Sequence, residues 1–255
     1  MFVEVNGNRL NVVSFGAGAR TLVAHGGWVG SWELWQQPFE LMSGRWRCVS
    51  YDHRGAGESP VAPHLVTPES LVSDLFSVLE VLGIERCVLA GESLGAIVAL
   101  EAARRAPERF EGLVVVDGGP GVTTDIAGPL IEGARSDWPG TVRRFADDCV
   151  PEPDADHIRR WGRDILLRAD GEIAARMFEC YLDGPEPFVA IEEIQVPTLV
   201  IHGTADAIVP FAIGEWMASA IPNATLVPIE GAGHVPTLSR PHEVVAAIER
   251  EFGPR

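Results

Sequence analysis

The chain has 255 residues, of which 46% are hydrophobic and 22% charged, and this predicts a globular protein with one large domain or a domain carrying a small insertion. Its 36 acidic and 20 basic residues give a net charge of −16, which disfavours nucleic acid and membrane partners because their surfaces are anionic. All the basic residues are arginine, so Schiff-base chemistry and a P-loop, which need lysine, are excluded.

Eight short apolar runs are expected to be strands, and turn residues bound most of them. They cover residues 2–5, 10–13, 21–24, 48–51, 87–90, 113–116, 198–201 and 225–229. Helical spacing of apolar residues follows several of them, over 67–82, 94–106 and 241–252. The alternation predicts an α/β fold with a mostly parallel eight-stranded sheet and helices on both of its faces.

Residues 121–197 interrupt this alternation, because they contain no clear strand. Helical patterns appear there over 131–135, 141–149, 154–169 and 172–182, with glycine and proline between them. We interpret this segment as a helical cap inserted between two strands. The core domain would then comprise residues 1–120 and 198–255.

The four cysteines are far apart and form no C-x-x-C pair, so nothing in the sequence requires an oxidising compartment. The N-terminal residues do not resemble a signal peptide, and no run approaches the ~18 apolar residues of a membrane span. We therefore expect a cytoplasmic protein. No metal-ligand pattern and no dinucleotide fingerprint is present, so we expect no metal and no cofactor, while homo-oligomerisation is left open.

The pentapeptide Gly91-Glu92-Ser93-Leu94-Gly95 follows the expected strand 87–90 and opens a helix. This is the setting in which a G-x-S-x-G motif forms a nucleophile elbow. The sharp turn strains the serine backbone, and the two glycines leave room for it. The hydroxyl would then lie at the carboxyl edge of the sheet, beside a helix N-terminus that favours negative charge. Ser93 is therefore the predicted nucleophile.

A serine hydroxyl needs a base and an acid that orients the base. His234 lies in the glycine-rich loop 231–236 after the last expected strand, and such a loop can bring an imidazole over the elbow. Asp206 follows the strand 198–201 and gives the chain order serine, acid, histidine. Asp117, at the end of the strand before, is the alternative acid. We favour Asp206 because its position fits the order and setting more fully.

A tetrahedral intermediate needs two amide donors for its oxyanion. One is expected from the backbone N–H of Leu94, directly after the nucleophile. The other is expected from Gly27, in the loop that follows the strand 21–24, with its neighbour Trp28 as the alternative in that loop. His25 is expected to brace this loop.

These motifs together resemble the α/β-hydrolase superfamily over nearly the whole chain. The matching segments are His25-Gly26-Gly27, the D-x-R-G-x-G-x-S turn at 52–59, the elbow at 91–95, residues 202–206 and Gly233-His234. Within the superfamily the chain is similar to small-capped esterases, enol-lactonases and C–C bond hydrolases. A serine nucleophile argues against haloalkane dehalogenase and epoxide hydrolase activity, because those relatives use a carboxylate. The resemblance implies that Arg54 is a salt-bridge partner and that Glu92 is a structural contact.

The ordered motifs predict a serine hydrolase that cleaves a carboxylic ester or lactone of a small apolar substrate through an acyl-enzyme. C–C bond hydrolysis and a non-hydrolytic lyase or synthase reaction on the same fold remain alternatives, and so does a ligand-binding receptor with vestigial catalysis. The pocket should lie between the elbow and the cap. Aromatic residues of the oxyanion loop and the cap are candidates for its lining: Trp28, Trp138, Trp161, Phe178 and Tyr181.

Overall fold

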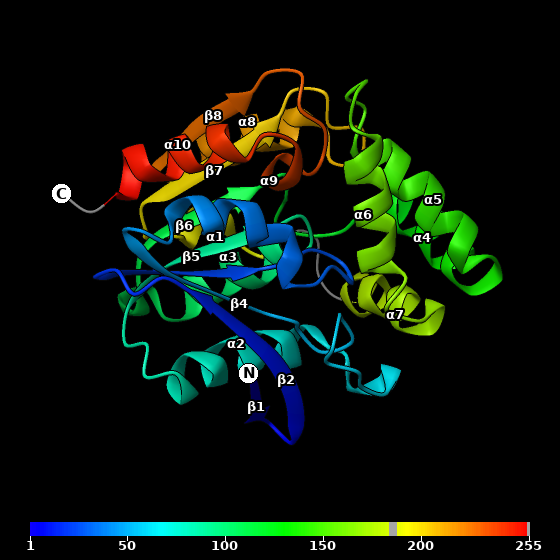
Figure 1. Cartoon of the computed structure of the whole chain (residues 1–255), viewed down its shortest axis with the longest axis horizontal. Coiled ribbons are helices and arrows are strands. Elements are labelled where there is room, and N and C mark those ends of the chain that lie inside the picture. The colour runs from blue at the N-terminus through cyan, green and yellow to red at the C-terminus, as the bar shows by residue number, and fades with distance from the viewer. Residues whose placement is uncertain (184–187, 254–255) are drawn as a thin grey trace.

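The computed structural model describes residues 1–183 and 188–253, and its centre is an eight-stranded sheet (Figure 1). The spatial order is β1-β2-β4-β3-β5-β6-β7-β8. β2 runs antiparallel to both of its neighbours, and β3 to β8 run parallel to one another. The strands are β1 (Phe2–Val5), β2 (Asn8–Phe15), β3 (Arg20–His25), β4 (Trp46–Tyr51), β5 (Cys87–Glu92), β6 (Phe110–Val116), β7 (Thr198–Gly203) and β8 (Ala224–Ile229).

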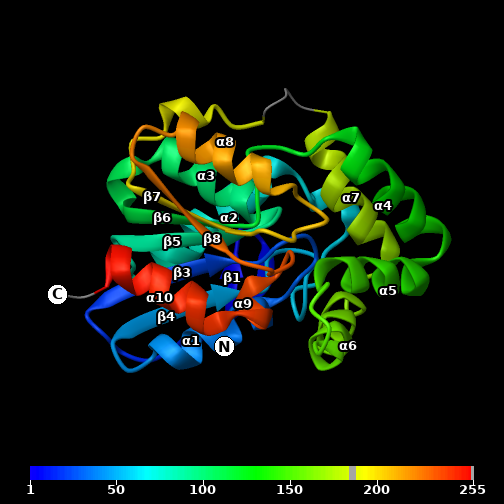
Figure 2. The same cartoon turned by 90° about the horizontal axis from the view of Figure 1, so that it is seen from above.

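Helices cover both faces of the sheet, which confirms the predicted architecture (Figure 2). One face carries α2 (Pro68–Val81), α3 (Gly95–Arg105) and α8 (Phe211–Ala220), and the other carries α1 (Gln36–Met42) and α10 (Pro241–Phe252). The short α9 (Pro236–Ser239) precedes α10. Single 3₁₀ turns occupy Trp32–Trp35, Pro63–Leu65, Pro107–Arg109 and Ile191–Glu193.

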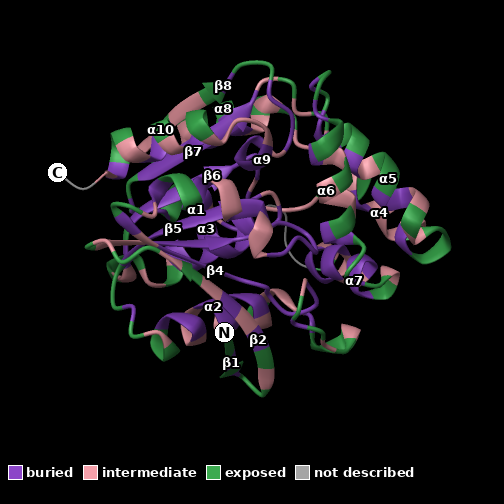
Figure 3. Cartoon of the chain, viewed as in Figure 1, coloured by how far each residue is buried: buried purple, intermediate pink, exposed green. Residues whose placement is uncertain are grey.

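Burial explains why the strand signals were strong. All six residues of β5 and all six of β7 are buried, because helices cover these strands on both sides (Figure 3). β8 lies at the edge of the sheet, and of its six residues only Ile229 is buried. Its apolar run is therefore less protected than its sequence indicated.

Two helices of the core show how local sequence fixes their ends and faces. The side chain of Thr67 accepts a hydrogen bond from the N–H of Ser70, whose hydroxyl in turn accepts from the N–H of Thr67, and this capping box starts α2. α3 starts directly after the elbow. Its first nine residues are buried because the helix packs against β5 and β6.

The turn at 52–59 is held against α2 by a buried ion pair. Arg54 donates from Nε and Nη2 to the two carboxylate oxygens of Asp74, at 2.7 Å each. Both side chains are at most 5% exposed. The structure thus gives Arg54 the salt-bridge partner expected from the sequence.

Four helices lie between β6 and β7: α4 (Thr124–Ser136), α5 (Trp138–Cys149), α6 (Asp156–Leu166) and α7 (Gly171–Leu182). They stand together at one end of the strands (Figure 1). These helices occupy the segment in which we expected the cap, except that residues 184–187 of that segment lie outside the described residues. α4 begins seven residues earlier than the expected helix at 131–135, because packing against α7 stabilises a stretch that contains Pro129.

Among the described residues, no helix combines the length and the apolar character needed to cross a membrane.

Candidate active site

Ser93 lies in a strained turn between β5 and α3. Its φ is +52°, a left-handed backbone conformation that residues other than glycine rarely adopt. A Cβ atom on Gly91 would lie 2.5 Å from the carbonyl oxygen of Gly95, and one on Gly95 would lie 2.5 Å from that of Gly26. Both flanking glycines are therefore required by close approaches of the backbone, as the motif predicted.

The structure brings Ser93, His234 and Asp206 together. Ser93 Oγ lies 2.8 Å from His234 Nε2, and His234 Nδ1 lies 2.8 Å from Asp206 Oδ2. The backbone N–H of His234 donates to the carbonyl of Cys149 at 2.8 Å, so the loop that carries the imidazole is attached to the end of α5. The three side chains come from segments separated by more than 25 residues, yet they form one continuous relay.

The Asp206 carboxylate is stabilised in its charged form. Burial alone would raise its pKa, but the charge of His234 and hydrogen bonds from His202, His234 and the N–H of Ile208 outweigh burial and hold the pKa below its ordinary range. Its Oδ1 also accepts from the N–H of Val209 at 3.0 Å. A carboxylate held in this way keeps its charge and its orientation towards the imidazole.

Asp117, the alternative acid, has a different set of contacts. Its Oδ1 accepts a hydrogen bond from the N–H of Gly203 at 2.7 Å. Burial raises the pKa of Asp117 well above its ordinary value, and the nearby charge of Asp206 raises it further. The imidazole of His234 is hydrogen bonded to Asp206, and Asp117 lies behind that pair.

The loop after β3 lies directly against the nucleophile. A Cβ on Gly27 would be 2.8 Å from Ser93 Cβ and 3.4 Å from Ser93 Oγ, so only glycine fits there. Trp28 follows with a φ of +35°. Its indole N–H donates to the carbonyl of Ala174 at 2.8 Å, which connects this loop to α7. Leu94, the other expected donor, is buried at the start of α3.

Two neutral histidines support the same loop. The rings of His25 and His53 are stacked with their centroids 4.8 Å apart and an interplanar angle of 11°. Burial lowers the pKa of His25 to about 3, with a contribution from His53, and burial lowers the pKa of His53 to about 4. His25 Nδ1 bonds to the carbonyl of Gly26, which agrees with the expected bracing role.

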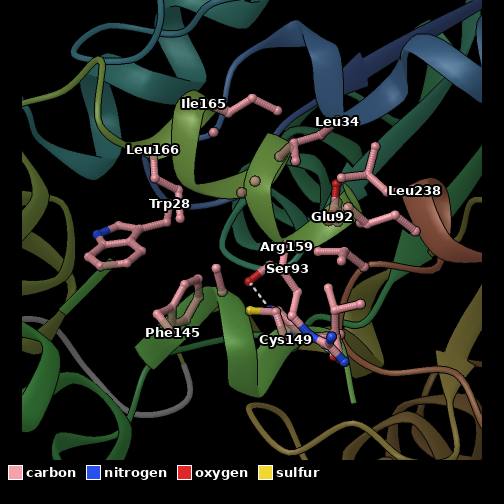
Figure 4. Close-up of a pocket in the computed structure, with 18 residues that line it drawn as sticks. Trp28, Leu34, Glu92, Ser93, Phe145, Cys149, Arg159, Ile165, Leu166 and Leu238 are labelled. Carbon is pink, nitrogen blue, oxygen red and sulfur yellow. Dashed lines mark hydrogen bonds between the residues drawn. The ribbon is translucent and has the colours of Figure 1, made fainter. Parts of the chain in front are cut away.

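Ser93 opens into a cavity, called here the inner pocket, of about 530 Å³ including the part open to solvent (Figure 4). His234 and Gly27 also line it. Most of the remaining lining is apolar and comes from the elements around the elbow and from α5 and α6: Trp28, Gly30, Leu34, Phe145, Ala146, Cys149, Val150, Ile158, Gly162, Ile165, Leu166, Val235 and Leu238, with Glu92 and Arg159.

Two of the five predicted pocket aromatics lie beside Ser93, and three do not. Trp28 lines the inner pocket, and Phe178 lines a second cavity that shares Trp28 and Ser93 with it. The other three, Trp138, Trp161 and Tyr181, line neither of these two cavities, and the prediction is wrong for them there. Trp138 and Tyr181 belong to a hydrophobic cluster that includes the buried residues of α7. Trp161 packs against a second cluster, which includes Leu34 and Ile165. The indole N–H of Trp138 donates to the carbonyl of Ala169 at 2.8 Å, which turns its ring into the helical segment.

Several residues of the site were not singled out as pocket residues from the sequence. Phe145 lies with its ring centroid 4.8 Å from that of Trp28 and 6.4 Å from that of His234. Ile158 and Ile165 are buried residues of α6, and their seven-residue spacing places them on one face of that helix. This spacing was the available signal, but it does not say which core the face covers.

Glu92 is the acidic residue in the wall of the inner pocket. It is 1% exposed, and its Oε2 has no hydrogen-bond partner among the described residues. Burial raises the pKa of Glu92 to about 8, and the charge of Asp206 contributes. The raised pKa favours the protonated, neutral form of this side chain.

One group of described residues has the composition of a metal site: Asp117, His202 and Asp206, with ligand atoms within 4.8 Å of one another. Each of these side chains already makes a hydrogen bond within the protein. His202 Nε2 bonds to the carbonyl of Val209 at 2.9 Å, Asp117 accepts from Gly203, and Asp206 accepts from His234. The donor set therefore fits a network that orients His234 better than it fits a metal centre.

Comparison with known proteins agrees with this geometry. The model of the Alpha/beta hydrolase family matches residues 22–247. The chain is similar to the pimeloyl-[acyl-carrier protein] methyl ester esterase of Aromatoleum aromaticum, with 31% identity over 189 residues that cover 64% of this chain and 72% of that protein. It is also similar to the putative carbamate hydrolase RutD of Pseudomonas syringae pv. syringae, with 28% identity over 251 residues, 88% of this chain and 90% of that protein.

Among solved structures, the enol-lactonase from Burkholderia xenovorans LB400 has the same fold, with a TM-score of 0.91 over 100% of both chains and 23% sequence identity. The match of the family model covers most of the chain and confirms the resemblance inferred from the motifs. The chain therefore belongs to the alpha/beta hydrolase family and is a hydrolase.

Proposed function

We propose that the protein hydrolyses a carboxylic ester or lactone of a small apolar substrate, with Ser93 as the nucleophile, His234 as the general base and Asp206 as the acid that orients it. The observation that carries this proposal is the relay of two 2.8 Å contacts, which begins at a strained serine in the wall of a pocket. An activated nucleophile is recognised by such a chain of serine, base and orienting acid.

In the first half of the reaction, Ser93 Oγ forms a bond to the substrate carbonyl carbon while its proton moves to His234 Nε2. The Asp206 carboxylate accepts from Nδ1–H at 2.8 Å and stabilises the imidazolium that forms. The carbonyl oxygen becomes an oxyanion, which the N–H groups of Gly27 and Leu94 would bind. The bond to the leaving oxygen then breaks, and that oxygen takes the proton from Nε2.

In the second half, a water molecule gives its proton to His234 Nε2 and attacks the acyl carbon. The same two amides hold the second oxyanion. The bond to Ser93 Oγ breaks and Oγ takes the proton back, so that the carboxylic acid leaves and the site is restored. Removing one oxyanion donor typically lowers turnover by ~10²–10³.

The pocket supports an apolar small molecule as the substrate, because its walls are mostly aliphatic and aromatic with few polar groups. Of the two relatives described above, one is named a methyl ester esterase and the other a putative carbamate hydrolase. In both kinds of substrate a carbonyl carbon carries a heteroatom leaving group, and the proposed relay acts on such a carbon.

The test is turnover of short-chain p-nitrophenyl esters and of small lactones by the wild type and two pairs of variants. Ser93→Ala is paired with Ser136→Ala, and His234→Ala with His242→Ala; Ser136 and His242 are exposed. We expect the two site variants to lose at least about 10³-fold in kcat, and the two controls to match the wild type. Full activity in Ser93→Ala would overturn the proposal, and so would the absence of ester and lactone turnover in the folded wild type.

A further inference from the structure

A second cavity, called here the side pocket, also opens at Ser93. Its volume is about 460 Å³ including space open to solvent. The two cavities share three lining residues, Ser93, Trp28 and Phe145. In Figure 4, Trp28 and Phe145 lie to one side of Ser93, and Leu34 and Leu238 lie to the other. Because Trp28 and Phe145 line both cavities, this pair lies at the boundary between two arms that meet at Ser93.

The side pocket has no polar side chain in its lining other than that of Ser93. It continues into a surface groove of about 870 Å³, including open solvent, between the loop after β6 and α8. The side pocket and the groove share the lining residues Gly119, Gly121, Val122, Ile126 and Val209. The groove ends at Trp216, whose side chain is 43% exposed, and Thr123 is its one polar lining residue.

The two arms differ in their relation to the base. His234 and Val235 line the inner pocket, whereas neither lines the side pocket. The leaving oxygen of an ester takes its proton from the base, so the leaving group must lie on the side of His234. The acyl group, on the other substituent of the tetrahedral carbon, then points into the side pocket.

We propose that the side pocket and the surface groove bind a linear acyl chain that runs from Ser93 past Val122 to Trp216, while the inner pocket takes a compact apolar leaving group. This inference rests on the proposed function and specifies its substrate class as an ester of a medium- or long-chain carboxylic acid with a small alcohol. Gly119 and Gly121 favour this path, because glycine adds no side chain between the two cavities. An apolar chain gains up to about fourfold in binding for each methylene removed from water.

The test compares methyl esters of acetic, hexanoic, decanoic and hexadecanoic acid as substrates of the wild type. We expect kcat/KM to rise with acyl length. A mirrored series, the acetate esters of methanol, hexanol and decanol, changes only the leaving group. Here we expect kcat/KM to fall once the alcohol exceeds the inner pocket.

Two variants locate the chain. Val122→Trp fills the junction of the two cavities, and we expect it to lower the ratio of decanoate to acetate kcat/KM by about tenfold or more, as the loss of several methylene contacts implies. Trp216→Ala shortens the groove at its outer end and should lower the hexadecanoate-to-hexanoate ratio. Matched controls are Ala212→Trp and Glu215→Ala, which change exposed residues of α8 outside the groove and should keep both ratios.

Unchanged acyl-length profiles in both Val122→Trp and Trp216→Ala would overturn the inference. It would also be overturned if Val122→Trp changed the alcohol series instead, because the arms would then be exchanged. Failure of the proposed function has a different signature, in which the wild type hydrolyses neither series.

Discussion

The carboxyl groups of Asp117 and Asp206 lie within 4.8 Å of each other in a buried cluster behind His234. Burial and the neighbouring charge raise the pKa of Asp117, while His234 and several hydrogen bonds lower that of Asp206. Two carboxylates at this distance do not both ionise easily, so the pair retains one proton on Asp117 and presents its negative charge from Asp206 to the imidazole.

This division of charge predicts unequal effects of two conservative substitutions. Asp206→Asn removes the charge that stabilises the imidazolium and should lower kcat by about 10³–10⁴. Asp117→Asn replaces a neutral acid by a neutral amide of the same shape and should lower kcat by less than about tenfold. Steady-state kinetics on one short ester measures both. An equal loss in the two variants would contradict the assignment of the charge to Asp206.

The contact between Gly27 and Ser93 predicts that the oxyanion loop tolerates no side chain at this position. Gly27→Ala would place a Cβ 2.8 Å from Ser93 Cβ, so the loop or the nucleophile must move. We expect kcat/KM to fall at least about 10²-fold, the loss typical of one misplaced oxyanion donor. Gly44→Ala is the matched control, because its Cβ meets no atom within 4 Å. Wild-type kinetics in Gly27→Ala would exclude this loop from the oxyanion site.

Glu92 predicts a pH-dependent penalty on stability. The unfolded chain ionises this residue near 4.5, and the folded chain near pH 8. Between these values the native state holds one proton more than the unfolded state, so the free energy of unfolding falls as the pH rises, by about 1.4 kcal/mol per pH unit from this group.

Glu92→Gln keeps the shape of the side chain and removes its titration. In urea unfolding at pH 5, 6.5 and 8, the variant should gain stability relative to the wild type with each step in pH. Glu230→Gln, at an exposed glutamate, is the control and should keep a constant difference from the wild type. A constant difference for Glu92→Gln as well would show that Glu92 ionises normally in the folded protein.

The Arg54–Asp74 pair predicts a large effect of breaking one buried ion pair. Arg54→Met leaves the carboxylate of Asp74 buried without its partner, and the free energy of unfolding should fall by about 3–5 kcal/mol. Arg135→Met breaks exposed pairs with Glu172 and Glu179 and should leave the unfolding midpoint unchanged. Equal midpoints for the two variants would mean that the turn at 52–59 does not depend on Arg54.

The sheet and the serine–histidine–aspartate cluster could be predicted from the sequence because their signals are local. A buried strand followed by Gly91-Glu92-Ser93-Leu94-Gly95 specifies the elbow. Its two glycines are needed because a Cβ at either position would collide with a nearby backbone oxygen. The glycine-rich loop after the last strand likewise predicted that His234 lies over the elbow. Parallel strands then bring these loops to one edge of the sheet.

The pocket lining could not be predicted with the same success, because it depends on which face each helix turns towards the sheet. Trp28 and Phe145 were both visible as aromatic residues, yet only packing shows that they meet at 4.8 Å above Ser93. Trp161 was an equally visible aromatic residue, yet it lines neither of the two cavities. α8 was also missed, since its apolar residues do not keep to one face, although it forms a wall of the surface groove.

Covalent labelling of Ser93 is the sharpest test of whether His234 activates this serine. The protein would be incubated with a fluorophosphonate probe, and the adduct located by peptide mass spectrometry in the wild type, in His234→Ala and in His242→Ala. We expect one adduct at Ser93 in the wild type and in His242→Ala, and a labelling rate lower by about 10³-fold or more in His234→Ala. A folded wild type that leaves Ser93 unlabelled, or an adduct at another residue, would rule out Ser93 as the activated nucleophile.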